Sequence, residues 1–171
     1  MLRSVVILPL LLATPLLARP VDDKDLVDRL VLDQNLKTFT KLIARAGLIE
    51  QLKSDGPYTI FAPNDAAFAK VPPATMDTWK KDKALLRKAL SYHIVASKLL
   101  DKDFKSGPLK TLSGESLAIY VRGRVGIGTG VVLAPPTSFI VNGLKPLLTD
   151  IPASNGTIHI VSTFLTPPTK K

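Results

Sequence analysis

The sequence predicts an α+β fold in which helices come first and strands second. Apolar residues recur at three-to-four spacing in residues 22–47 and 83–90, the periodicity of helices that bury one face. After Leu100, glycines separate short apolar stretches, a pattern typical of strands joined by tight turns. Because the two patterns are segregated along the chain, they do not indicate alternating units of a parallel sheet.

Residues 22–47 are predicted to form two helices with a break near residues 33–35. Acidic residues occupy the first turn, where the helix dipole favours negative charge, and Gly47 provides a C-terminal stop. A third short helix over residues 48–52 is predicted to end at residues 54–57, Ser-Asp-Gly-Pro, whose composition is typical of a turn.

Residues 58–62 are predicted to form the first strand, which is followed directly by a helix. The Asn64 side chain is placed to cap the exposed N–H groups of that helix, and Asp65 suits its dipole. The sequence Val-Pro-Pro at residues 71–73 then ends the helix. Two more helices are predicted over residues 74–80 and 83–90, and the second is expected to bury Leu85, Leu86, Ala89 and Leu90.

Most of the predicted strands lie in the second half of the chain. Residues 91–95 lead into one strand, and the other expected members of the meander are 117–121, 125–132, 138–141 and 147–150.

The last predicted strand follows a tight turn at Asn155-Gly156, two residues that tolerate positive φ. It is expected to end near Thr166, because the two prolines that follow lack the N–H groups of a sheet ladder. Alternation places Ile158, Ile160 and Phe164 on one face and His159, Val161 and Leu165 on the other. Both faces are largely apolar, so this strand is expected to be central and paired between strands from much earlier in the chain.

The first 18 residues have the pattern of a signal peptide. Arg3 precedes an apolar run over residues 5–17, and Ala18 offers a small residue for cleavage. A membrane anchor is the alternative, but such a run spans only about 20 Å as a helix, against about 30 Å of hydrocarbon. We therefore predict export to the periplasm or the extracellular space, a domain over residues 19–168 and a tail over residues 169–171. The mature chain is expected to have no transmembrane segment.

Composition excludes several classes of function. The chain has no cysteine, which excludes disulfides, thiolate metal sites and cysteine nucleophiles. Its net charge is +9, and removal of a leader that carries only Arg3 leaves +8, enough to attract acidic polymers or anionic lipids. Nucleic acid is not an expected partner, because exposed aromatics for base stacking are not interleaved with the basic residues.

Catalytic motifs are missing. His93 and His159 are the only histidines, and neither has a potential ligand at metal-binding spacing. We interpret both as half-buried imidazoles satisfied by a backbone carbonyl or a hydroxyl, with a role as ligand or switch as the alternative. Residues 126–130, Gly-Ile-Gly-Thr-Gly, lack the third glycine of a nucleotide-binding loop, and the acidic residues are not paired. No catalytic residue, cofactor or metal site is predicted, and the protein is not expected to be an enzyme.

Three motifs resemble those of fasciclin domains, in the order and approximate spacing of that family. The opening motif is Thr-Ile-Phe-Ala-Pro-Asn-Asp-Ala-Ala-Phe at residues 59–68, and the central one is Leu-Ser-Tyr-His-Ile-Val at residues 90–95. The closing motif is Asn-Gly-Thr-Ile-His-Ile-Val at residues 155–161, followed by two prolines. The resemblance covers roughly residues 21–168 and implies a β-rich wedge or sandwich with N-terminal and flanking short helices.

The resemblance also implies a non-catalytic extracellular module for cell adhesion or protein interaction, with a surface or matrix protein as its partner. In animal members a Tyr-His motif and an Asp-Ile motif are implicated in integrin recognition. The matching positions in this sequence are Tyr92, His93, Asp150 and Ile151. These four residues are the predicted partner-binding site.

A competing hypothesis is electrostatic binding of acidic polysaccharide or another polyanion. Three basic clusters are its candidate sites. Arg122 and Arg124 are the most suggestive, because their guanidinium groups flank a glycine and suit sulfate, carboxylate or phosphate. The other two clusters are Lys80, Lys81, Lys83, Arg87 and Lys88, and Lys98, Lys102, Lys105 and Lys110. Asn155-Gly156-Thr157 is a formal glycosylation sequon, although turn formation explains the same residues.

Overall fold

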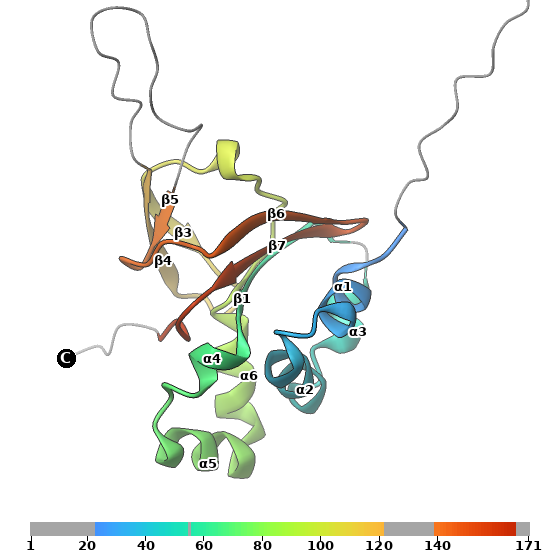
Figure 1. The fold of residues 1–171 in the computed structure, drawn as a ribbon, viewed down its shortest axis with the longest axis vertical. Coiled ribbons are helices and arrows are strands. Elements are labelled where there is room, and N and C mark those ends of the chain that lie inside the picture. Colours follow the sequence, from blue (N-terminus) through green and yellow to red (C-terminus); the bar gives the residue numbers. More distant parts are fainter. Residues whose placement is uncertain (1–22, 55, 122–138, 167–171) are drawn as a thin grey trace, which may run out of the picture.

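A computed structural model describes residues 23–54, 56–121 and 139–166 of the chain (Figure 1). The α-helices are α1 Leu26–Leu32, α2 Lys37–Ala46, α3 Ile49–Lys53, α4 Asp65–Phe68, α5 Pro73–Lys81 and α6 Lys83–Ser91, with a short 3₁₀ helix, η1, at Asp101–Asp103. The strands are β1 Tyr58–Pro63, β2 Ile94–Val95, β3 Gly107–Lys110, β4 Ser116–Val121, β5 Phe139–Val141, β6 Leu148–Ala153 and β7 Gly156–Val161. The predicted α+β class is confirmed.

The strands form two sheets. The larger has the order β2-β1-β7-β6, and the smaller has the order β3-β4-β5. In the larger sheet β1 runs parallel to β7, from Tyr58 opposite Gly156 to Pro63 opposite Val161, whereas β2 and β6 are antiparallel to their neighbours. The helices gather at one end of the molecule in Figure 1, and the smaller sheet lies on the other side of β1 and β7.

Two apolar clusters flank the β1–β7 pair. Ile158, Ile160 and Phe164 pack in the cluster formed with the helices, whereas Val161 and Leu165 pack in the cluster formed with the smaller sheet. Every residue of β7 is buried, which confirms the predicted central strand and its alternation. One detail of that prediction is wrong, because only one of the two neighbours of β7 comes from early in the chain. That neighbour is β1, whereas β6 immediately precedes β7.

Predicted Gly47 and Asn64 occupy their expected places, whereas the acidic start of α1 differs. Asp25, expected in the first turn, is the N-cap of α1 and forms a capping box with Asp28, which was not predicted. Gly47 ends α2 in the left-handed conformation, with φ 71°. The Asn64 side chain accepts a hydrogen bond from the Ala67 N–H at 2.8 Å. Asp65 does more than predicted, because its carboxylate also accepts from the Thr38 N–H at 2.8 Å and so ties α4 to the first turn of α2.

The hairpin before β7 differs from the prediction. Its two loop residues are Ser154 and Asn155, because Ala153 pairs with Gly156 in the ladder. Neither Asn155 nor Gly156 has a positive φ, so positive φ is not the reason for the glycine. A Cβ at Gly156 would collide with the Tyr58 carbonyl oxygen and lie 2.7 Å from Leu26 Cδ1, so the close approach of β1 and α1 requires glycine here.

Two further predictions need correction, and one strand was not predicted at all. The last strand ends at Val161, before the expected Thr166, because the chain leaves the ladder after that residue. Leu85 is 47% exposed, while Leu86 and Leu90 of the same helix are buried as predicted. Strand β3 was not predicted, since its sequence Gly-Pro-Leu-Lys is short and begins with two residues disfavoured in strands.

Several predictions concern parts of the chain outside the described ranges. These are the signal peptide over residues 1–18, the strand over 125–132, the cluster of Arg122 and Arg124, and the tail. Within the described ranges, no helix combines the length and apolar character needed to span a bilayer.

Candidate functional site

Strand β6 forms one edge of the larger sheet, and its outer side pairs with no other strand in the described part of the chain. Leu147 and Leu148, at its start, are 59% and 53% exposed. Asp150 is exposed and Ile151 is half-buried. We call these four residues the β6 edge.

A β-bulge shapes this edge. The register of β6 against β7 shifts between Leu148 and Ile151, and Asp150 lies within the shift with φ 59°. Aspartate tolerates this left-handed conformation better than most residues. Two contacts hold it: the Asp150 N–H donates to His159 Nδ1 at 3.3 Å, and Asp150 Oδ1 accepts from the Asp101 N–H at 2.7 Å. The carboxylate is therefore fixed in position at the surface, where its side chain is 41% exposed.

The buried side chain of His159 holds the β-bulge in position. It is fully buried, and its ring lies against Phe61, with centroids 5.6 Å apart and planes 27° apart. Because the Asp150 N–H can only donate, Nδ1 must accept, which leaves Nε2 to donate to the Leu99 carbonyl at 3.0 Å. Burial lowers the pKa of His159, although the Leu99 carbonyl and the Asp150 carboxylate oppose this. The neutral imidazole thus positions Asp150 and has no spare nitrogen for a ligand.

Asp101 makes this end of the sheet acidic. It begins the 3₁₀ helix Asp101–Asp103, next to Asp150. Partial burial raises the pKa of Asp101, and the neighbouring Asp150 carboxylate raises it further. The two carboxylates favour a partner that presents a hydrogen-bond donor or a positive charge to the exposed oxygens of Asp150.

Unlike Asp150, the predicted site residues Tyr92 and His93 lie in the core of the domain. They are 1% and 0% exposed. The Tyr92 hydroxyl donates to the Ser116 carbonyl at 3.2 Å and accepts from Asn142 Nδ2 at 3.0 Å, which ties the end of α6 to the smaller sheet.

His93 fastens the segment that follows β7 to the end of α6. Its Nδ1 donates to the Ala89 carbonyl at 3.0 Å, and its Nε2 accepts from the Leu165 N–H at 3.0 Å. Burial lowers the pKa of His93 to about 4, and the Ala89 carbonyl opposes this only in part. Both histidines therefore have backbone partners, one of the two kinds predicted, but both are fully buried and not half-buried.

The structure does not bring the four predicted partner-binding residues together. Among the described residues, no hydrogen bond or ring contact joins Tyr92 or His93 to Asp150 or Ile151. Leu147 and Leu148 were not among the site residues predicted from the sequence. A signal was present, because successive strand residues point to opposite faces and two adjacent leucines cannot both enter one core.

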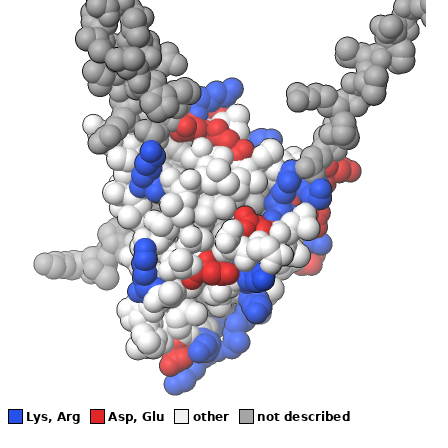
Figure 2. Space-filling view, in the orientation of Figure 1, with Lys and Arg blue, Asp and Glu red and all other residues white. Residues whose placement is uncertain are grey.

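A second surface gathers basic side chains where helices α2, α3, α5 and α6 meet (Figure 2). Arg45 donates to the Lys80 carbonyl, and the Arg87 guanidinium lies 3.3 Å from Gln51 Oε1. Lys80 also pairs with Asp77 at 3.0 Å, both side chains being 60% exposed, so that ion pair adds little stability. We call the set Arg45, Lys80, Lys81, Lys83 and Arg87 the basic helical surface. This surface includes Lys80 and Lys81 of the predicted polyanion-binding cluster.

The described ranges contain no group of three or more histidine, aspartate or glutamate side chains that could hold a metal ion.

Comparison with known proteins gives consistent matches. The sequence pattern of the Fasciclin domain family matches residues 34–167. Protein sll1483 of Synechocystis sp. is 33% identical over 138 residues, covering 77% of this chain and 69% of that protein. Transforming growth factor-beta-induced protein ig-h3 of Sus scrofa is 30% identical over 82% of this chain, which spans 19% of that protein. Cell surface glycolipoprotein MPB83 of Mycobacterium bovis is 31% identical over 75% of this chain and 51% of that protein.

A solved structure shares the fold. It is that of a FAS1 domain pair from the insect cell adhesion molecule fasciclin I, with a TM-score of 0.57 and 20% identity. The match covers 79% of this chain and 46% of that one.

Proposed function

The chain belongs to the fasciclin domain family, and from this premise we propose that it is an exported adhesion or protein-interaction module. Domains of this family are non-catalytic modules of surface and adhesion proteins. The name of one relative places that relative at the cell surface, and this supports a role outside the cytoplasm, in the periplasm or the matrix. The partner of the proposed module is a surface or matrix protein.

The β6 edge is the observation that carries this proposal. Two large apolar side chains are more than half exposed there, beside a carboxylate held by a bulge. Pro152 has no N–H to donate, and the bulge twists the edge, so a partner strand cannot extend the sheet regularly. We therefore assign recognition to side chains: Leu147, Leu148, Asp150 and Ile151.

Tyr92 and His93, which lie in the core, have a structural role in the proposed module. Their hydrogen bonds fix the end of α6 against the smaller sheet and against the segment that follows β7. We assign them to the support of the domain and not to direct contact with the partner, because neither side chain is accessible.

An adhesion assay on immobilised protein tests the proposal. The variant Leu147→Ser with Leu148→Ser is expected to lower the retention of cells of the source organism about tenfold, because two serines would bury much less apolar area against the partner. The matched control is Val31→Ser with Leu32→Ser, since these α1 residues are 63% and 58% exposed. The control is expected to adhere like the unmodified protein. Equal retention by both double variants would refute the role of the β6 edge.

Polyanion binding is the second candidate, favoured by the basic helical surface. Lys80, Lys81, Lys83 and Arg87 of the predicted cluster come from α5 and α6, and Arg45 is added by α2, which packs on α6. Charges gathered from separate helices can engage several groups of an acidic polymer at once. Arg122 and Arg124 remain part of this second proposal.

A further inference from the structure

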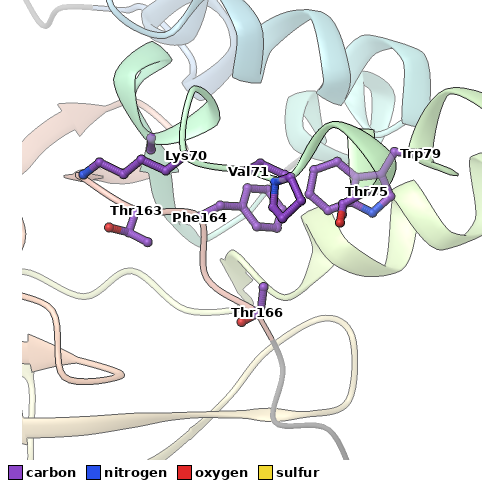
Figure 3. A pocket seen from close by; sticks show the side chains of 9 residues that line it. Lys70, Val71, Thr75, Trp79, Thr163, Phe164 and Thr166 are labelled. Carbon is purple, nitrogen blue, oxygen red and sulfur yellow. The ribbon is translucent and has the colours of Figure 1, made fainter. Parts of the chain in front are cut away.

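A pocket lies between the loop that joins α4 to α5 and the segment that follows β7 (Figure 3). Its volume is about 360 Å³, within the range of small-molecule sites. Its lining residues are Ala67, Lys70, Val71, Pro72, Thr75, Trp79, Thr163, Phe164 and Thr166. None of these belongs to the β6 edge or to the basic helical surface.

One part of the pocket is apolar. The rings of Trp79 and Phe164 pack with centroids 4.6 Å apart, and Val71 and Pro72 continue the same wall. Trp79 is 7% exposed and Phe164 is 6% exposed, so both rings are fixed by the surrounding core. A rigid aromatic wall of this kind binds an apolar body without a large loss of side-chain freedom.

The opposite part of the pocket carries a positive charge. Lys70 Nζ donates to the Ser162 carbonyl at 3.1 Å, which leaves two of its three N–H groups for other acceptors. In Figure 3 Lys70 and Thr163 lie on the far side of Phe164 from Trp79. None of the nine lining residues is acidic, so the pocket offers this ammonium no carboxylate partner.

We propose that this pocket binds a small amphiphilic carboxylate, of the class of medium-chain fatty acids. The apolar body lies along Phe164 and Trp79, and the carboxylate accepts hydrogen bonds from Lys70 Nζ and the Thr163 hydroxyl. The charge of the pocket selects an anionic head group, because a cationic head group is repelled by Lys70 and a neutral alcohol lacks the charge-assisted hydrogen bond.

Trp79 allows a direct test, because it is the only tryptophan in the chain. We would titrate the full chain with decanoate, decanol and decyltrimethylammonium below their micellar concentrations. The single indole N–H signal in the NMR spectrum and the tryptophan fluorescence report contact. Decanoate is expected to give saturable changes and to bind up to about fivefold more tightly than decanol, the ratio for an ion pair with an exposed lysine.

Variants separate the two parts of the pocket. Lys70→Met is expected to weaken the binding of decanoate by up to about fivefold and to leave the binding of decanol unchanged, whereas Lys41→Met, on the exposed face of α2, changes neither. Thr75→Phe fills the pocket beside Trp79 and is expected to weaken the binding of both decanoate and decanol. Circular dichroism confirms that each variant is folded.

Several results would overturn the proposal. Failure of decanoate to perturb the indole signal is one, and equal affinity for the anionic and cationic probes is another. Unchanged binding of decanoate to the Lys70→Met variant would also overturn the proposal. A Trp79 signal that depends on protein concentration without any probe would assign the pocket to contact between copies of the chain.

Discussion

At the scale of single residues, the two histidines are structural groups whose protonation opposes folding. Each uses both ring nitrogens in hydrogen bonds with the backbone, and each is fully buried. Protonation would put a hydrogen on a nitrogen that already faces a backbone N–H, as at Leu165 for His93 and at Asp150 for His159. The folded state therefore favours the neutral imidazoles.

We expect the free energy of unfolding to fall as the pH is lowered. The pKa of His93 is about 4 in the folded state, below its ordinary value of 6.5, so between these values the unfolded chain binds more protons. The stabilisation is complete above pH 6.5 and is lost toward pH 4, at about 1.4 kcal/mol per pH unit for one histidine. Urea denaturation across this range measures the slope.

His93→Gln identifies the residue responsible. Glutamine can donate to Ala89 and accept from Leu165 but does not titrate, so the variant is expected to show a flatter slope and a lower stability at neutral pH. Asp101 acts in the opposite direction, because its raised pKa favours folding at low pH. An unchanged slope in His93→Gln would show that other groups control the acid sensitivity.

Gly156→Ala is predicted to be one of the most damaging small substitutions. The added methyl group would meet the Tyr58 carbonyl oxygen and Leu26 Cδ1, in a part of the core that cannot expand without separating β1 from β7. We expect a loss of about 2–3 kcal/mol in the free energy of unfolding, the range for overpacking. Gly143→Ala is the control, because a Cβ there meets open space and only its φ of 80° opposes the change. The control is expected to cost about 1 kcal/mol. Chemical denaturation of both variants measures the difference, and equal losses would contradict the steric explanation.

At the scale of elements, Asn155 joins three parts of the fold. Its Oδ1 accepts from the Leu26 N–H at 3.0 Å, and its Nδ2 donates to the Leu52 carbonyl at 2.7 Å and the Ser54 carbonyl at 3.4 Å. One side chain in the β6–β7 loop thus connects the start of α1 with the end of α3. These contacts give the closing motif a structural reason for asparagine.

Asn155→Ala is expected to lower the free energy of unfolding by about 2 kcal/mol, because it leaves the Leu26 N–H and the Leu52 carbonyl without their partner. Thermal unfolding measures the loss.

The same geometry predicts that folded protein is not glycosylated at this sequon. Both hydrogens of Asn155 Nδ2 are used, and Thr157 is fully buried. Mass spectrometry of protein from a glycosylating host checks this, and a glycan on folded, stable protein would contradict it.

Local sequence signals predicted the helices well, because Asp25, Gly47 and Asn64 act on neighbouring backbone groups. Tertiary contacts explain the misses. Leu85 belongs to an apolar run, but the packing of α6 on α2 and α5 leaves its side of the helix exposed. For the site, the motifs indicated which residues matter to the fold, but burial of Tyr92 and His93 depends on strands far away in the sequence. The local sequence indicated a satisfied imidazole for His93 but not the distant strands that bury it and Tyr92.

At the scale of the whole molecule, the two candidate surfaces have different chemistry. The β6 edge combines leucines with carboxylates, whereas the basic helical surface carries excess positive charge. Salt distinguishes them, because it screens exposed charges and leaves apolar contacts intact. The two proposed partners are therefore separable in one experiment.

We expect adhesion through the β6 edge to persist as ionic strength rises, and binding to an acidic polysaccharide to weaken steeply. Lys83→Glu with Arg87→Glu is expected to lower retention on a heparin column strongly. The matched control, Lys102→Glu with Lys110→Glu, places the same charge change on exposed residues outside the basic helical surface. Equal losses in both variants would assign retention to net charge and not to the surface.

The parallel pairing of Tyr58–Pro63 with Gly156–Val161 joins two strands that are far apart in the sequence. The ribosome releases β1 long before its central neighbour exists, and closing so long a loop slows the formation of the sheet. A nascent chain that stops before Gly156 therefore leaves one edge of β1 without its partner strand, and the larger sheet can be completed only after β7 has been synthesised.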